Sequence, residues 1–223
     1  MDRLIILLTT AIGGLLTSPP VFVVLLLNLV PAGGVLWLGW SPLALLLLYW
    51  IENVVVGAAN VAKMDAAARG KPNGTALAAG VIPFFLMHYG MFCLVHLVFT
   101  VLVGGGVFGG ADPADVFRSA WATRLDFAWA VVAIAALHAL DLFLWMREGA
   151  WRYTDPQSQM AAPYGRVVVL HVTILGGAFL LAETGAPASA ILLLAVLKTI
   201  YEVLSTARRE RKIRDAAEAQ GRR

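Results

Sequence analysis

Apolar stretches of about 20 residues recur along nearly the whole length of this chain of 223 residues. A helix of about 20 residues is long enough to cross the hydrocarbon core of a bilayer. A segment inside lipid has to satisfy its backbone hydrogen bonds within the protein, which leaves helices or a closed barrel. The short alternating segments of about ten residues that mark a barrel are not found. The sequence therefore predicts an all-α fold, a polytopic transmembrane helical bundle.

The composition supports the same class. Hydrophobic residues make up 60% of the chain and charged residues 14%, and the mean hydropathy is +0.78. Soluble domains carry roughly 25% charged residues. These values exclude a soluble globular domain, and we expect the lipid bilayer, rather than a nucleic acid, as the partner of this chain. A homo-oligomer is left open.

We predict about six spans. The first is too long for a straight crossing, since about 29 residues at 1.5 Å each exceed a core of about 30 Å. Ser18, Pro19 and Pro20 are expected to break it, and whether residues 4–16 cross the membrane or form an interfacial helix is left open. Residues 1–207 then form one transmembrane domain, followed by a basic cytoplasmic tail at 208–223. The spans lie roughly at 4–32, 42–63, 76–103, 124–147, 165–184 and 187–207.

The basic residues of the short loops predict the orientation. Loops rich in Lys and Arg stay in the cytoplasm. Basic residues follow the second and the fourth span and fill the tail after the sixth, so both termini are predicted to be cytoplasmic, in a bacterial inner (cytoplasmic) membrane. The loop residues counted here are Lys63, Arg69, Lys71, Arg147, Arg152 and Arg166.

Ionisable residues inside the predicted spans are costly and usually face the bundle interior, so each marks a candidate functional position. Counted from the span ends at about 1.5 Å per residue, one group lies near the midplane and a second lies one or two turns nearer the cytoplasm. His96 lies about 12 Å further out than His88. The midplane group is Glu52, His88, His138 and Lys198, and the second group is Asp141, His171 and Glu202.

Carboxylates and imidazoles from separate helices are the ligands of Zn, Fe or Mn sites in helical bundles. An open coordination position on such a metal would activate water, so we expect a metal-dependent hydrolase acting on a lipid or another amphiphile. The predicted ligands are Glu52, His88, Asp141 and His171, with His138 as a substitute or outer partner, and the remaining candidates are His96, Asn53, Lys198, Glu202, Tyr164 and Arg166.

Several alternatives stay open. Two facing histidines, such as His88 with His171 or His138, are what a haem for electron transfer would need. Acidic or basic groups at the midplane are also typical of ion- or proton-coupled transporters. The polar residues can equally hold a structural protein together, with Lys198 and Glu202 as an ion pair and asparagines such as Asn53 as packing contacts. Whether the chain is an enzyme is left open.

Three segments, YWIENVVVGAANVAKM, MHYGMFCLVH and PYGRVVVLHVTILGG, resemble an uncharacterised family of bacterial and archaeal integral membrane proteins, a domain of unknown function. The resemblance covers about residues 28–203. It implies a small multi-pass membrane protein and carries no activity with it. The residues that match the family's motifs are Glu52, Asn53, His88, His96, Tyr164, Arg166 and His171.

Overall fold

The computed structural model describes Val21, Val23 and residues 25–28, 33–34, 37–38, 40, 42–104, 112, 114, 118, 125–172 and 187–221. Within these ranges the chain is built of helices and the turns between them, and it contains no strand. The all-helical prediction is confirmed for this part of the chain. The predicted interfacial helix at 4–16 and the break at residues 18–20 lie outside it.

Within the described residues, three helices are long and apolar enough to cross a membrane. They are α3 (Pro42–Arg69), α4 (Gly74–Phe99), which continues as the π-helical turn η1 (Thr100–Gly104), and α6 (Leu125–Arg147). Three of the predicted spans, at 42–63, 76–103 and 124–147, are thereby confirmed as membrane-compatible helices, and α3 runs on past its predicted end.

The second half of the chain is less regular. A 3-10 turn η3 (Ala150–Tyr153) and a short helix α7 (Pro156–Ala161) follow α6. Asp155 caps α7 by accepting a hydrogen bond from the backbone N–H of Ser158 at 3.0 Å. A further helix covers residues 164–172, the start of the span predicted at 165–184, whose remainder lies outside the described residues. The last helix, α9 (Pro187–Gly221), contains the span predicted at 187–207 and continues through the predicted tail.

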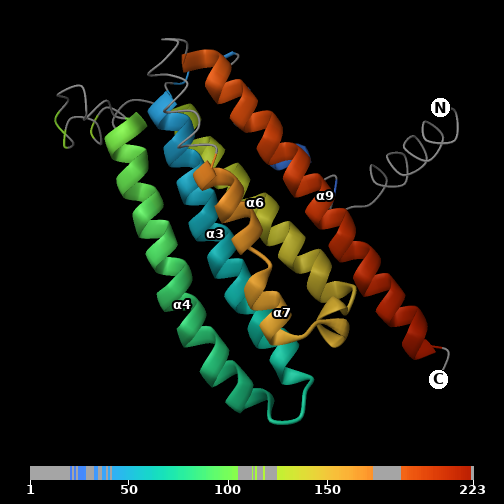
Figure 1. Cartoon of the computed structure of the whole chain (residues 1–223). Coiled ribbons are helices and arrows are strands. Elements are labelled where there is room, and N and C mark those ends of the chain that lie inside the picture. The colour runs from blue at the N-terminus through green and yellow to red at the C-terminus, as the bar shows by residue number, and fades with distance from the viewer. Residues whose placement is uncertain are drawn as a thin grey trace, which may run out of the picture.

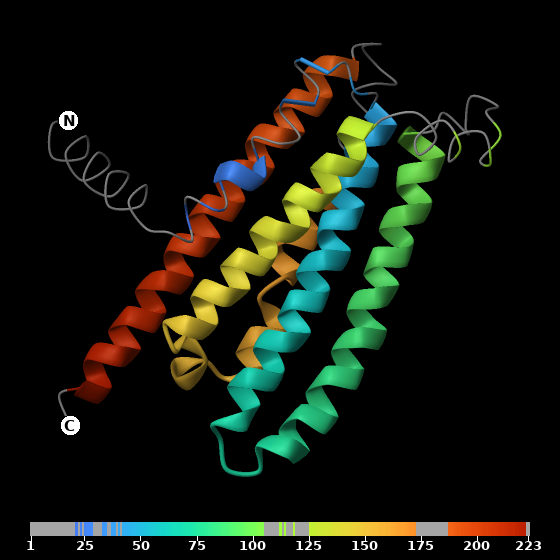
Figure 2. The ribbon, with the colours of Figure 1, turned by 180° about the vertical axis from the view of Figure 1, so that it is seen from behind.

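Helix α3 lies in the middle of the bundle. Figures 1 and 2 show α4 and α9 at opposite edges, with α3 and α6 between them. One apolar cluster joins α3 to α6 through Leu47, Leu48 and Ile134. Another joins α3 and α4 to the helix at 164–172 through Phe85 and Val167. Because α3 is covered from several sides, its polar side chains meet those of the other helices.

The outward faces are apolar as well. Large hydrophobic side chains are exposed on α4, α6, the helix at 164–172 and α9, and Val54 is exposed on α3, as expected for surfaces that meet acyl chains. On α4 they include Phe84, Met87, Met91, Leu94 and Val98, on α6 Trp129, Val132 and Phe143, on the helix at 164–172 Val168 and Val172, and on α9 Val196, Ile200 and Leu204.

The turn between α3 and α4 is tight at Gly74. Gly74 begins α4, and a Cβ there would collide with the backbone carbonyl of Ala68. We expect Gly74→Ala to lower the free energy of unfolding in detergent by about 1–3 kcal/mol. Gly80 is the matched control, since a Cβ there meets nothing within 4 Å, and Gly80→Ala is expected to raise stability by up to about 1 kcal/mol. Equal effects of the two substitutions would contradict the tight turn.

Candidate functional site

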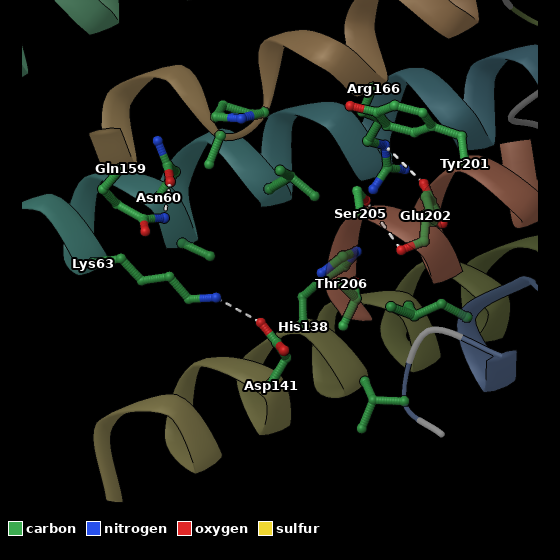
Figure 3. A pocket seen from close by; sticks show the side chains of 16 residues that line it. Asn60, Lys63, His138, Asp141, Gln159, Arg166, Tyr201, Glu202, Ser205 and Thr206 are labelled. Atoms are coloured by element: carbon green, nitrogen blue, oxygen red, sulfur yellow. Dashed lines mark hydrogen bonds and ion pairs between the residues drawn. The ribbon is translucent and has the colours of Figure 1, made fainter. Parts of the chain in front are cut away.

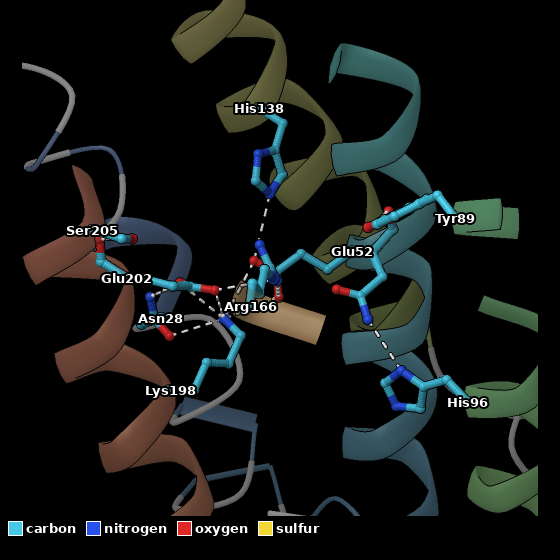
Figure 4. Close-up of polar contacts among 10 residues, drawn as sticks. Asn28, Glu52, Tyr89, His96, His138, Arg166, Lys198, Glu202 and Ser205 are labelled. Carbon is cyan, nitrogen blue, oxygen red and sulfur yellow. Dashed lines mark hydrogen bonds and ion pairs between the residues drawn. The ribbon is translucent and has the colours of Figure 1, made fainter. Parts of the chain in front are cut away.

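Glu52 is the centre of a buried charge network. It lies on α3 with none of its surface exposed. One carboxylate oxygen, Oε2, lies 2.6 Å from Nη2 of Arg166 and 3.1 Å from Nζ of Lys198. The other, Oε1, lies 3.4 Å from Nε2 of His138. Three other segments thus contribute partners to this one carboxylate of α3, and Figure 4 shows them converging.

Glu202 closes the network from the side of α9. Its carboxylate lies 3.0 Å from Nζ of Lys198 and 3.1 Å from Nε of Arg166. The side chain of Asn28 donates to Glu202 at 2.8 Å and accepts from Lys198 at 3.1 Å. Each cation therefore bridges two carboxylates, and the four formal charges cancel. Removing any one of them leaves a buried charge without its counterpart, which is far more costly than an exposed change.

The sequence around residue 165 explains how Arg166 reaches this centre. Pro163 precedes the helix at 164–172, where a proline is tolerated at the start but not in the interior. Gly165 has no side chain, and a Cβ there would overlap the hydroxyl of Tyr201. The helix can therefore approach α9 closely, which brings the Arg166 guanidinium between Glu52 and Glu202.

A second buried ion pair lies nearer the end of α3. Nζ of Lys63 contacts the carboxylate of Asp141 at 2.6 Å, and the two side chains are 6% and 15% exposed. Lys63 also lies 5.6 Å from the centre of the Trp145 ring. Asn60, one turn before Lys63, accepts a hydrogen bond from the buried Gln159 side chain at 2.6 Å. The ion pair of Lys63 and Asp141 joins α3 to α6, as the contact of Glu52 with Lys198 joins α3 to α9.

A pocket of about 130 Å³ separates the two sets of charges. It is open at one side and has basic, acidic and neutral polar groups in its wall (Figure 3). His138 lies in this wall and reaches back to Glu52, so it connects the pocket to the buried network. The polar side chains of the wall are those of Asn60, Lys63, His138, Asp141, Gln159, Arg166, Tyr201, Glu202, Ser205 and Thr206.

The two histidines of α4 have different surroundings. His88 is exposed, and its Nδ1 lies 2.8 Å from the hydroxyl of Tyr164. His96 is only 1% exposed, and its Nδ1 lies 3.1 Å from the side-chain nitrogen of Asn53. His88 was expected in the midplane cluster with Glu52 and His96 outside it. In the structure, His96 is the one that faces α3.

Two residues counted as loop charges are buried in the bundle. Arg166 is 8% exposed and Lys63 is 5% exposed, and both have carboxylate partners. The position of Arg166 between two buried carboxylates was not predicted, because it was counted as a loop charge. Besides its match to the family's motifs, the signal was its place three residues after a proline, in an apolar stretch that also holds Tyr164 and His171.

The predicted metal ligands are engaged elsewhere. Glu52 and Asp141 contact basic side chains, His88 contacts Tyr164, and Nδ1 of His171 lies 2.8 Å from the carbonyl oxygen of Val167. Among the residues that the structure describes, no three His, Cys, Asp or Glu side chains lie together as metal ligands. The four predicted ligands do not form one coordination sphere, and a Zn, Fe or Mn site stays a prediction.

Other expected contacts are present. Lys198 and Glu202 form the predicted ion pair, and Asn53 and Asn60 join helices by side-chain hydrogen bonds. His138 lies beside Glu52, as their equal depth predicted, and Lys198 completes that layer. The contacts among Glu52, His138 and Lys198 agree with the common depth predicted for them, and the partners of the acids are mainly cations.

Comparisons with known proteins bear on the family alone. Neither the curated proteins nor the solved structures contain a match to this chain. The segments that pointed to an uncharacterised family do belong to one, because a family model matches residues 14–219, nearly the whole length. The chain is therefore a member of the family of unknown function DUF6498.

Proposed function

We propose that this chain is a proton-coupled carrier of a small polar solute, a multi-pass protein of six spans with both ends in the cytoplasm of a bacterium. The observation that carries the proposal is the pocket of about 130 Å³ whose wall contains charges of both signs. Water occupies about 30 Å³ per molecule, so this volume suits a solute of a few heavy atoms. Ionisable residues at membrane depth are typical of such pathways.

The charge arrangement supplies a way to couple protons to binding. Arg166 and Glu202 both line the pocket and also belong to the buried network. A proton on one carboxylate would leave a guanidinium or ammonium free to bind an anionic group of the solute. His138 spans the distance, since its ring lines the pocket and its Nε2 contacts Glu52. His138 can therefore move a proton between the pocket and Glu52.

A purely structural role explains these residues less well. Replacing a buried ion pair by well-packed apolar residues is often neutral or stabilising. Helix packing alone therefore does not require the two sets of charges, and it does not require them to surround a polar space. The metal-dependent hydrolase stays a prediction as well, because the described residues lack the ligand cluster that it needs.

The proposed orientation rests on the basic residues that are not buried. Lys71 follows α3 and donates to the backbone oxygen of Arg152, which follows α6, at 3.5 Å. The two loops therefore lie side by side, and Figures 1 and 2 place the C-terminus at the same end of the bundle. Together with Arg69 and Arg147, these loops supply the positive charge that favours the cytoplasmic side.

Uptake into proteoliposomes tests the proposal. We expect a panel of radiolabelled amino acids and small carboxylates to include a solute that accumulates when the outside is acidified, and not when the pH is equal on both sides. Glu52→Gln and Asp141→Asn are expected to lower this uptake at least tenfold. The control is His88→Ala, an exposed histidine away from the pocket, which should keep it. Uptake that ignores the pH gradient would contradict proton coupling, and a panel without any accumulated solute would contradict the carrier.

A further inference from the structure

A second polar site lies on the other side of α3, between α4 and the helix at 164–172. The rings of His96 and His171 lie with their centres 5.3 Å apart. Neither ring touches the pocket described above. His96 is 1% exposed, and His171 is partly buried. Two imidazoles from separate helices therefore lie next to each other inside the bundle.

Each ring makes a hydrogen bond through one of its nitrogens, and its other nitrogen has no partner among the described residues. Nδ1 of His171 donates to the carbonyl oxygen of Val167 at 2.8 Å, which leaves the lone pair on Nε2. Nδ1 of His96 contacts the amide of Asn53. Among the described residues, Nε2 of both histidines and Oδ1 of Asn53 have no hydrogen-bond partner although they are buried. Buried polar atoms are rarely left in this state.

These contacts are the ones that metal-binding histidines make. A ligating imidazole almost always donates its other N–H to a carbonyl or a carboxylate. His171 does this already. Rotating the Asn53 amide by half a turn exchanges its oxygen and nitrogen, and Nδ1 of His96 can then donate to Oδ1. Both Nε2 atoms would then be free to bind, and the unpartnered amide oxygen would be satisfied.

The spacing of the rings agrees with a shared metal ion. With metal–nitrogen bonds of about 2 Å, two imidazoles on one ion have their centres about 5 Å apart at a tetrahedral angle and about 6 Å apart when the ion lies on the line between the two nitrogens. The measured separation of the ring centres is 5.3 Å, and the planes are inclined by 59°. Two directly stacked rings would instead lie nearly parallel. The hydroxyl of Thr100, one turn after His96, is a further buried oxygen without a partner in the described part of the chain.

The chemistry of the site selects the ion. Imidazole suits zinc, copper, iron and nickel. No carboxylate or thiolate completes a group of three ligands here among the described residues, so no anionic ligand neutralises a divalent charge. The cost of burying an ion rises with the square of its charge, which favours a monovalent one. We propose that His96 and His171 form a binding site for a single Cu(I) ion.

Copper titration of the tag-free protein tests this site. Cu(I) is added with ascorbate under anaerobic conditions, and the protein competes with the chromophoric chelator bathocuproine disulfonate. We expect one tightly bound Cu(I) per chain, and a loss of affinity of at least tenfold in His96→Leu and in His171→Leu. The matched control is His88→Leu on the same helix, which should bind as the wild type does. Glu52→Gln should also keep the ion, which separates this site from the proposed carrier function.

X-ray absorption of the copper-loaded wild type tests the site without any variant, so it applies even if the buried variants do not fold. Two imidazoles in the coordination shell are expected, with no sulfur. A sulfur-dominated shell, an unaltered affinity in both variants, or an equal loss in His88→Leu would overturn the site. Preferential retention of Zn²⁺ when both ions are offered in equal amounts would overturn the choice of copper.

Discussion

Replacing Glu52 by glutamine is expected to lower the free energy of unfolding by about 3–5 kcal/mol, the usual cost of removing one partner from a buried ion pair. The carboxylate is fully buried and contacts both Arg166 and Lys198. Without it, two buried cations share the single carboxylate of Glu202. The amide of glutamine keeps the volume of the side chain and one acceptor oxygen, but its NH2 group would face the donors of Arg166, Lys198 or His138. The loss therefore reports the charge together with one acceptor.

Unfolding in mixed detergent micelles, followed by tryptophan fluorescence, measures this effect. Glu148, an exposed residue after α6, is the control, and Glu148→Gln should change stability by less than about 0.5 kcal/mol. Adding Lys198→Met to Glu52→Gln removes the surplus cation and should restore more than half of the loss. A Glu52→Gln variant as stable as the wild type would mean that the network is not formed in the folded protein.

The second large effect concerns Lys63 and Asp141. We expect Lys63→Met and Asp141→Leu each to cost about 3 kcal/mol and the double variant to cost much less than their sum, because each single change removes the opposite charge from the buried pair. Proton-driven uptake should be lost in all three variants. The double variant would then be nearly as stable as the wild type but inactive in uptake. This result would distinguish a charge pair that takes part in transport from one that only joins helices.

The exposed pair of Asp65 and Arg69 on α3 provides the comparison. Its side chains are 40% and 78% exposed, and exposed pairs at this spacing contribute about 0.3–0.5 kcal/mol. The same double-mutant cycle should give a coupling energy in that range. If the buried pair gives no larger value, the contact between Lys63 and Asp141 is not formed. If the double variant keeps full uptake, this pair has no part in transport.

Helices and depth could be predicted from the sequence because they depend on local properties. The apolar runs at 42–63, 76–103 and 124–147 became α3, α4 with η1, and α6. Counting residues along a span gives the depth of Glu52, His138 and Lys198, because each residue of a helix rises by a constant amount. The i,i+4 spacing of Lys198 and Glu202 likewise fixes their contact before the fold is known.

The rotation of each helix about its axis could not be predicted in the same way. His88 and His96 are eight residues apart and therefore differ by about 80° around α4, which is enough to place one outside and the other against α3. Which of them faces inward depends on the packing of Phe85 and Tyr89 against neighbouring helices. The role of Arg166 was missed for a related reason, since a basic residue at a span end is ordinarily a loop charge.

The length of α9 has a mechanical consequence. Its 35 residues form one helix of about 50 Å, well beyond the roughly 30 Å of a bilayer core. Its interior contains neither proline nor glycine, the usual causes of a kink. Lys198 and Glu202 in the buried network are therefore carried on the same rod as the arginines from Arg208 onward. If the C-terminal end of α9 is displaced, the whole helix tilts, and Lys198 and Glu202 move within the buried network.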